Sequence, residues 1–250
     1  MFENEENKNI LLYNPLSMFY VLFLLLFTSL LLPYIAFAGK LISQALGVPF
    51  YTIFAMFLFS LFGSYVNIKV KEKEVSQPVI ILREVSFFGI RWQIPELGYG
   101  VRKTVIAVNV GGALIPTFFS LYLLLYSVPS YEQNLIIAYL KILAAFIVVT
   151  LIVHAFARPI KGFGIAVPSF IPPSAAALTS AILFPIYTRT NPFIIAYVAG
   201  TLGTLVGADL LNFNKIPELG SPIVSIGGAG VFDGIYITGI MSIFLLWLII

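Results

Sequence analysis

Seven long apolar runs constrain this chain more than any other feature of its sequence. They lie at roughly 16–38, 49–68, 104–127, 134–157, 173–188, 192–212 and 222–250. A helix needs about 20 apolar residues to cross a bilayer, and continuous runs without alternation favour helices over a β-barrel. We therefore expect an all-α, polytopic bundle of about seven transmembrane helices. It forms one membrane domain over residues 1–250, with the lipid bilayer as its partner.

The composition supports a membrane protein over a soluble one. The chain is 60% hydrophobic and 10% charged, with a mean hydropathy of +1.00, whereas soluble domains carry roughly 25% charged residues. No basic run is long enough to predict nucleic-acid binding. The sequence has no cysteine and one histidine, His154, which excludes Cys-based and His-rich metal centres. No phosphate-binding loop or dinucleotide fingerprint is present, so we expect no cofactor.

The distribution of Lys and Arg predicts the orientation in the cell membrane. Lys40, Arg189 and Lys141, whose stem can snorkel from near a helix end, fall on the expected outer side. The other eleven of the fourteen basic residues fall on the opposite side: Lys8, Lys69, Lys71, Lys73, Arg83, Arg91, Arg102, Lys103, Arg158, Lys161 and Lys215. Positive residues favour the cytoplasm, so we predict a multi-pass protein with its N-terminus inside and its C-terminus outside.

Two segments between the runs are predicted to be non-helical. The stretch 69–103 is the only sizeable polar piece, and β-prone runs on either side of Phe88 and Gly89 predict a small cytoplasmic β-hairpin. The hairpin at 78–95 is either a connector that caps the bundle or a ledge that presents an edge strand to a partner. The segment 158–172 is broken by Pro and Gly, and a re-entrant path is one alternative for it.

Two aspartates differ from every other acidic residue in the chain. The glutamates fall in expected loops or tails, whereas Asp209 and Asp233 fall inside the last two apolar runs. These runs point in opposite directions, so both carboxylates are expected at similar depth near the inner surface. An ionisable group there costs several kcal/mol unless it is paired, wetted or neutralised, and it marks a candidate functional site.

The sequence leaves several functions open for this pair. Two carboxylates in one low-dielectric site can share a proton and activate water against a peptide carbonyl, as in an intramembrane aspartyl protease acting on a transmembrane peptide. The same pair can bind and release a proton or a metal cation, as in a transporter or channel. Alternatively, each Asp caps a helix end or meets a cation, and a non-catalytic scaffold protein built on the hairpin would need neither.

Polar and small residues near the same depth are candidates to support the acidic pair. The candidates are Asn109, Arg158, Asn212, Gly228, Gly230 and Gly234. The glycines allow an irregular backbone and close approach, and Arg158 either anchors a helix at the interface or pairs with one aspartate. The sequence VNVGGA at 108–113 also echoes VSIGGA at 224–229, although six residues are too few to establish a duplication.

Two family resemblances follow from these motifs. The segments 109–113, 157–166, 203–212 and 227–239 resemble the signatures of an uncharacterised family of prokaryotic polytopic membrane proteins, a domain of unknown function. This resemblance implies a multi-helix membrane protein and names no activity. A weaker resemblance is to the presenilin, signal-peptide-peptidase and prepilin-peptidase group, which carries one Asp on a helix and a second in a Gly-x-Gly-Asp motif on the next. It implies Asp209 and Asp233 as catalytic residues, although Val231 and Phe232 separate the glycines from Asp233 here.

Overall fold

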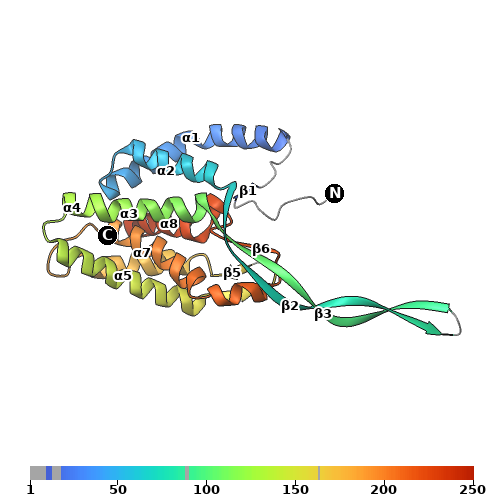
Figure 1. The fold of residues 1–250 in the computed structure, drawn as a ribbon. Coiled ribbons are helices and arrows are strands. Elements are labelled where there is room, and N and C mark those ends of the chain that lie inside the picture. Colours follow the sequence, from blue (N-terminus) through green and yellow to red (C-terminus); the bar gives the residue numbers. More distant parts are fainter. Residues whose placement is uncertain (1–9, 13–17, 88–89, 163) are drawn as a thin grey trace.

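The computed structural model describes residues 10–12, 18–87, 90–162 and 164–250, and it is mostly helical with two β-sheets (Figure 1). The N-terminal tail, the first residues of the expected run at 16–38 and the hairpin turn at 88–89 lie outside the described residues. The helices are α1 (Met18–Leu46), α2 (Phe50–Gly63), α3 (Ile115–Tyr122), α4 (Val128–Tyr131), α5 (Leu135–Phe156), α6 (Ile171–Leu183), α7 (Pro192–Thr204) and α8 (Gly234–Ile249). Three π-helical segments extend them: η1 (Val110–Leu114), η2 (Leu123–Ser127) and η3 (Leu205–Leu210).

The helices form one bundle with apolar outer faces. Within the described residues, three helical segments are long and apolar enough to cross a membrane: Val110–Tyr131, Leu135–Phe156 and Pro192–Leu210. The shorter apolar helices α2, α6 and α8 lie in the same bundle. On α5, Leu140 and Leu151 are largely exposed, and a bilayer would cover such a surface.

Helix α7 forms the centre of the bundle. All its residues from Ile194 to Thr201 are buried, because α5, α6 and α8 pack around it. The close approach between α5 and the helix formed by α7 and η3 depends on glycine. A Cβ at Gly203 would lie 2.7 Å from Cγ1 of Val149, and one at Gly207 would lie 2.6 Å from the carbonyl oxygen of Thr150. Small residues at such steps let membrane helices approach closely.

A long β-hairpin leaves one end of the bundle (Figure 1). Strands β2 (Val66–Phe87) and β3 (Ile90–Asn109) pair antiparallel along their length. At the base, β1 (Ile10–Leu12) pairs with β2, and β6 (Ile223–Ile226) pairs in parallel with β3, which gives the order β1-β2-β3-β6. The all-α prediction therefore holds for the bundle alone. The sequence hides β6 because its four residues read as the start of the apolar run at 222–250.

Beyond its base, the hairpin is a ribbon of two strands that pair only with each other. Leu82, Trp92 and Leu97 are exposed on it, and an ion pair joins Arg83 to Glu96 across the strands at 3.3 Å. Near the base, the hydrogen bond from Lys69 lowers the pKa of the Glu72 carboxyl. A two-stranded ribbon alone is marginally stable in water, so it adds little to the stability of the bundle.

We expect the bundle to fold without the outer part of this ribbon. Replacing residues 76–101 by an Asn-Gly turn keeps the strand pairs from Glu74↔Lys103 inward and supplies a favoured hairpin turn. The midpoint of thermal unfolding in detergent should then change by less than about 3 °C, because few buried contacts are lost. Loss of folded protein would show instead that the ribbon belongs to the cooperative core.

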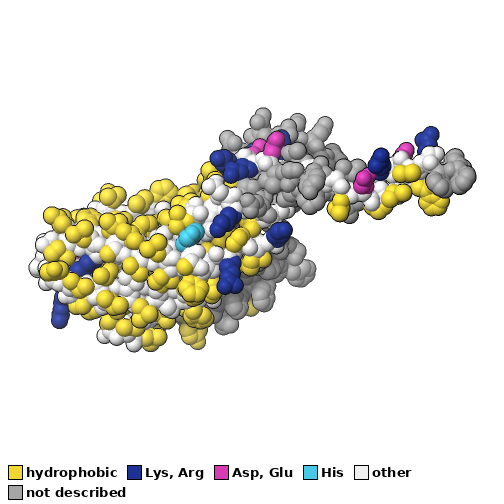
Figure 2. Space-filling model, turned by 90° about the horizontal axis from the view of Figure 1, so that it is seen from below, with side chains coloured by type: hydrophobic (Ala, Val, Ile, Leu, Met, Phe, Trp, Pro, Cys, Tyr) yellow, Lys and Arg dark blue, Asp and Glu magenta, His cyan; other side chains and the backbone are white. Residues whose placement is uncertain are grey.

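The predicted Pro- and Gly-broken segment contains a second small sheet. Strands β4 (Arg158–Ile160) and β5 (Gly164–Ala166) pair antiparallel directly after α5. Arg158 and Lys161 are exposed there. Figure 2 shows Lys and Arg side chains near the single histidine, at the end from which the hairpin leaves, beside a largely hydrophobic flank. The re-entrant alternative for 158–172 stays a prediction.

Candidate functional site

The two aspartates lie on neighbouring elements near the hairpin end of the bundle. Asp209 belongs to η3, the π-helical end of α7. The chain then passes through the 3₁₀ segment η4 (Phe213–Leu219) and β6, turns at Gly227–Gly230, and enters α8 directly after Asp233. π-Helical turns occur mostly as local bulges and are frequent at functional sites.

The Asp233 carboxylate caps helix α8. Its Oδ1 accepts a hydrogen bond from the backbone N–H of Ile235 at 3.0 Å, and its Oδ2 accepts one from Ala229 at 3.4 Å. The first N–H groups of a helix lack partners within the helix, so a carboxylate at this position stabilises the helix start. The capping alternative from the sequence is therefore realised at Asp233, and the same two bonds hold its carboxylate in place.

Asp209 has a different environment. Its side chain is half-buried, and no hydrogen bond or ion pair reaches its carboxyl group from the residues that the structure describes. The two acids therefore differ in their surroundings: backbone amides fix Asp233, whereas Asp209 has no fixed partner among the described residues.

The glycine turn before Asp233 packs against the two other segments that enter the bundle here. Gly227 and Gly230 have positive φ angles of 72° and 62°, which glycine adopts without strain. A Cβ at Gly230 would lie 2.2 Å from Oγ of Ser64. The echoed segments lie side by side, since β3 pairs with β6 in the register Val108↔Ile226. Of the other predicted glycines, Gly228 is exposed, and a Cβ at Gly234 would meet nothing within 4 Å.

Asn109 supports the glycine turn indirectly. The side chain is fully buried; its Nδ2 donates to the carbonyl oxygen of Ser64 at 2.8 Å and to Oδ1 of Asn67 at 3.2 Å. Its Oδ1 accepts from the N–H of Gly112 at 2.8 Å, which caps η1. These bonds engage both ends of the amide, so Asn109 joins the segment after α2 to β2 and η1. Sequence reasoning missed its partners Ser64 and Asn67, together with Ser225, which donates to Oδ1 of Asn67.

Asn212 binds the end of the π-helical segment. Its Nδ2 donates to the carbonyl oxygen of Ala208 at 2.9 Å and lies 3.3 Å from Nδ1 of His154. Lys215 donates to its Oδ1 at 2.9 Å. Asn212 therefore joins η3 to the end of α5 and to Lys215 of η4. Arg158 is exposed, and the ion pairs among the described residues do not include it.

No group of three or more His, Cys, Asp or Glu side chains comes together in the part of the chain that the structure describes. Ca²⁺ takes six to eight oxygen ligands and Mg²⁺ requires near-octahedral geometry, so two carboxylates alone form an incomplete site for either ion.

The long apolar helices and the acid pair at one end of their bundle define a helical membrane protein. A family match covers residues 61–245, from the end of α2 into α8, and its description is "Protein of unknown function (DUF1614)". The chain belongs to this family. No curated protein and no solved structure matches the chain, and the resemblance to aspartyl proteases receives no support from these comparisons.

Proposed function

We propose that this protein spans the cell membrane seven times and that Asp209 and Asp233 form a site that binds and releases a proton or a monovalent cation. The proposed spans are α1, α2, the helical segment Val110–Tyr131, α5, α6, α7 with η3, and α8. The hairpin end faces the cytoplasm, with the N-terminus inside and the C-terminus outside. The position of Arg158, Lys161 and Lys215 at the hairpin end supports this orientation.

The difference between the two carboxylates carries the proposal. Backbone amides hold Asp233 in place, whereas Asp209 has no hydrogen-bonding partner among the described residues. A cation between them, whether a proton or a larger ion, relieves the repulsion between two like charges in a poorly solvated site. Irregular backbone at the glycine turn and in η3 brings carbonyl groups to the same depth, as membrane proteins allow only where backbone is buried or lines a cavity.

Proteolysis is the second alternative for this pair. In an aspartyl protease both carboxyl groups must face one water molecule and the scissile carbonyl. Here both oxygens of Asp233 accept hydrogen bonds from backbone N–H groups. Each carboxylate oxygen keeps a second lone pair, so these bonds are compatible with either a cation or a water molecule beside Asp233. The protease alternative therefore stays a prediction, and the experiment below separates it from cation exchange.

Flux measurements on reconstituted protein test the proposal. Proteoliposomes with a K⁺ or Na⁺ gradient and an internal pH dye should show proton or cation movement well above that of empty vesicles. Asp209→Asn and Asp233→Asn should each reduce the rate more than about 10-fold, since a loss of roughly 1.4 kcal/mol in binding already changes occupancy tenfold. Asparagine is itself a good helix cap, so Asp233→Asn removes the charge while the fold is retained.

Glu96→Gln on the exposed ribbon is the matched control and should leave the rate unchanged, because this carboxylate is far from the acid pair along the hairpin. Wild-type protein that moves no proton, Na⁺ or K⁺ above the level of empty vesicles would refute the proposal. Cleavage of a helical reporter peptide that both aspartate variants abolish would establish the protease alternative instead.

A further inference from the structure

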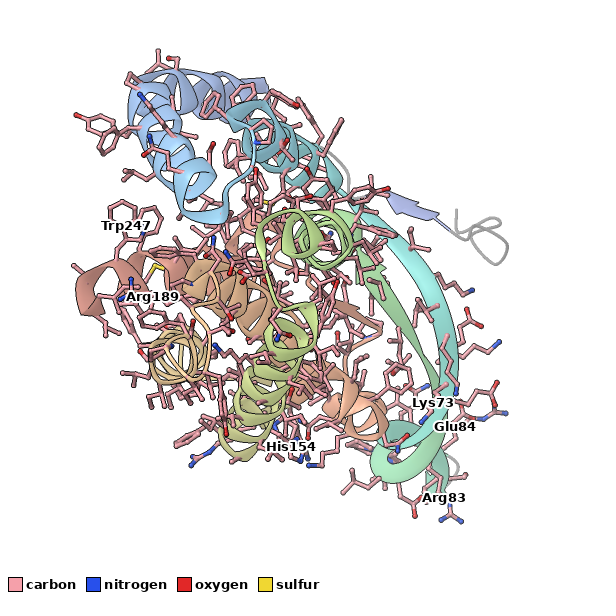
Figure 3. The ribbon with its side chains drawn as sticks, turned by 90° about the vertical axis from the view of Figure 1, so that its left-hand side faces the viewer. Lys73, Arg83, Glu84, His154, Arg189 and Trp247 are labelled. Carbon is pink, nitrogen blue, oxygen red and sulfur yellow. The ribbon has the colours of Figure 1, made fainter. Side chains whose placement is uncertain are left out.

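A second candidate site lies at the end of the bundle opposite the hairpin. A cavity of about 620 Å³ opens there between the ends of five elements. Figure 3 looks onto this end and shows Arg189 and Trp247 on the same side of the bundle. Both side chains line the cavity, with Glu132, Thr190 and Asn191 among the other lining residues. None of these residues belongs to the acid pair or to its supporting network.

The wall of this cavity is held by hydrogen bonds between distant segments. Asn191 caps α7 by accepting from Phe193 N–H at 2.9 Å, and its Nδ2 donates to the carbonyl oxygen of Ala45 at 2.9 Å. Its own N–H donates to Oε1 of Glu132 at 2.7 Å. These bonds join the end of α1, the loop after α4 and the start of α7, so the shape of the cavity is set by the fold.

The cavity offers one cation with open hydrogen-bond donors. Arg189 is exposed on the rim, and no ion pair engages it among the described residues. Glu132 also lines the cavity, and its carboxylate accepts a hydrogen bond from the N–H of Asn191. An anionic group placed beside Arg189 therefore gains a bidentate, charge-assisted partner.

Aromatic side chains form the other part of the cavity. The rings of Phe193 and Trp247 lie 5.8 Å apart, and Trp247 and Tyr131 are largely exposed. Trp and Tyr concentrate at the headgroup level of membranes. A ligand here meets a cation, apolar rings and the end of a membrane-spanning bundle at the same time. The anionic molecule with a long apolar part that is present at that depth is a phospholipid.

We infer that this cavity binds the headgroup of an anionic phospholipid, with the phosphate on Arg189 and the glycerol and first methylenes on Trp247 and Phe193. The site is separate from the acid pair, so its occupancy does not depend on the proposed cation exchange.

Native mass spectrometry tests this inference. Wild-type protein extracted from vesicles of phosphatidylcholine with one-fifth phosphatidylglycerol should retain phosphatidylglycerol in preference. Arg189→Gln should reduce the retained fraction at least five-fold, and Trp247→Ala should reduce it by a smaller factor. The matched control is Lys40→Gln, because Lys40 is an exposed cation on α1 one turn before Gln44 and does not line the cavity.

Equal retention by Arg189→Gln and wild type would overturn the inference, as would equal losses in Arg189→Gln and Lys40→Gln. Wild-type protein that retains phosphatidylglycerol only in proportion to its share of the vesicle would also overturn it. If inorganic phosphate displaced the lipid at low millimolar concentration, the site would be a phosphate site and the assignment to a lipid would fail.

Discussion

Replacing Gly112 by alanine is expected to destabilise the bundle by about 3 kcal/mol or more. A Cβ at this position would lie 2.2 Å from the carbonyl oxygen of Gly227 and 2.7 Å from that of Gly230. Both obstacles are backbone atoms of a turn that is itself packed on Ser64, so a rotamer change cannot relieve the overlap. The chain must instead separate η1 from the turn before α8, which also disturbs the bond from Gly112 N–H to Asn109.

The measurement is the midpoint of unfolding in a titration with sodium dodecyl sulfate, followed by circular dichroism. Gly234→Ala is the control, because a Cβ there would meet nothing within 4 Å and the residue opens a helix. Alanine has a higher helix propensity than glycine, so the control should be neutral or slightly more stable. A Gly112→Ala protein as stable as Gly234→Ala would show that the two glycine segments do not pack as described.

Lys141→Met should cost on the order of 3 kcal/mol, although methionine suits a membrane helix better than lysine by composition. Lys141 is only 5% exposed. Its ammonium group donates to the carbonyl oxygens of Phe184 and Thr188 and to Oγ1 of Thr190. These oxygens follow the end of α6, where helix carbonyls lack partners within the helix. The carbonyl oxygen of Phe184 keeps a hydrogen bond from the N–H of Thr190 at 3.3 Å. Methionine would remove the ammonium donor from Thr188 and Thr190 as well, with no replacement.

Lys40→Met is the matched control for this variant. Lys40 is exposed on α1, so its replacement should change the detergent-unfolding midpoint little. Equal midpoints for Lys141→Met and Lys40→Met would contradict the assigned role of Lys141. A second readout is proteolysis of the loop 184–191, which should become faster in Lys141→Met alone, because the three bonds hold this loop against α5.

The expected position of Lys141 is a case in which sequence reasoning was wrong. A lysine near a helix end in a membrane protein is typically extended to the interface, and the sequence predicted an anchor at the outer surface. The structure turns the side chain inward, toward carbonyl groups more than forty residues away in the chain. The helical face on which a residue lies depends on which helices pack together, and a single apolar run does not contain that information.

The positions of the helices were more predictable than the direction of the Lys141 side chain, because they depend on local sequence. Each helix depends on the local length and hydropathy of its own run, and most described helices overlap the expected runs. Their bounds differ: α1 continues to Leu46, α4 lies outside the runs, and β3 occupies the first residues of the run at 104–127. The hairpin was also predictable from local sequence, since β-prone segments flank Phe88 and Gly89. Its extent and the pairing with β6 were not predictable, because a parallel strand contributed from residue 223 onward requires knowledge of the whole fold.

The surroundings of Asp233 and Asn109 differ in how far the sequence predicts them. Asp209 and Asp233 stand out in the sequence because so few charges fall inside the apolar runs. Asp233 has local capping partners at Ala229 and Ile235, and this role was one of the stated alternatives. The partners of Asn109 come from the segment after α2, from β2 and from η1. No spacing rule joins these segments, so its hydrogen bonds were not predictable, and its role beside the acid pair stays a prediction.

The pairing of β3 with β6 links the hairpin to the segment that leads into Asp233. A pull or twist applied to the ribbon reaches β6 through main-chain hydrogen bonds, and β6 continues through the glycine turn to Asp233. Backbone ladders resist sliding because every bond in the register would have to break together. A protein that binds the exposed ribbon would therefore be connected to the start of α8 through paired strands.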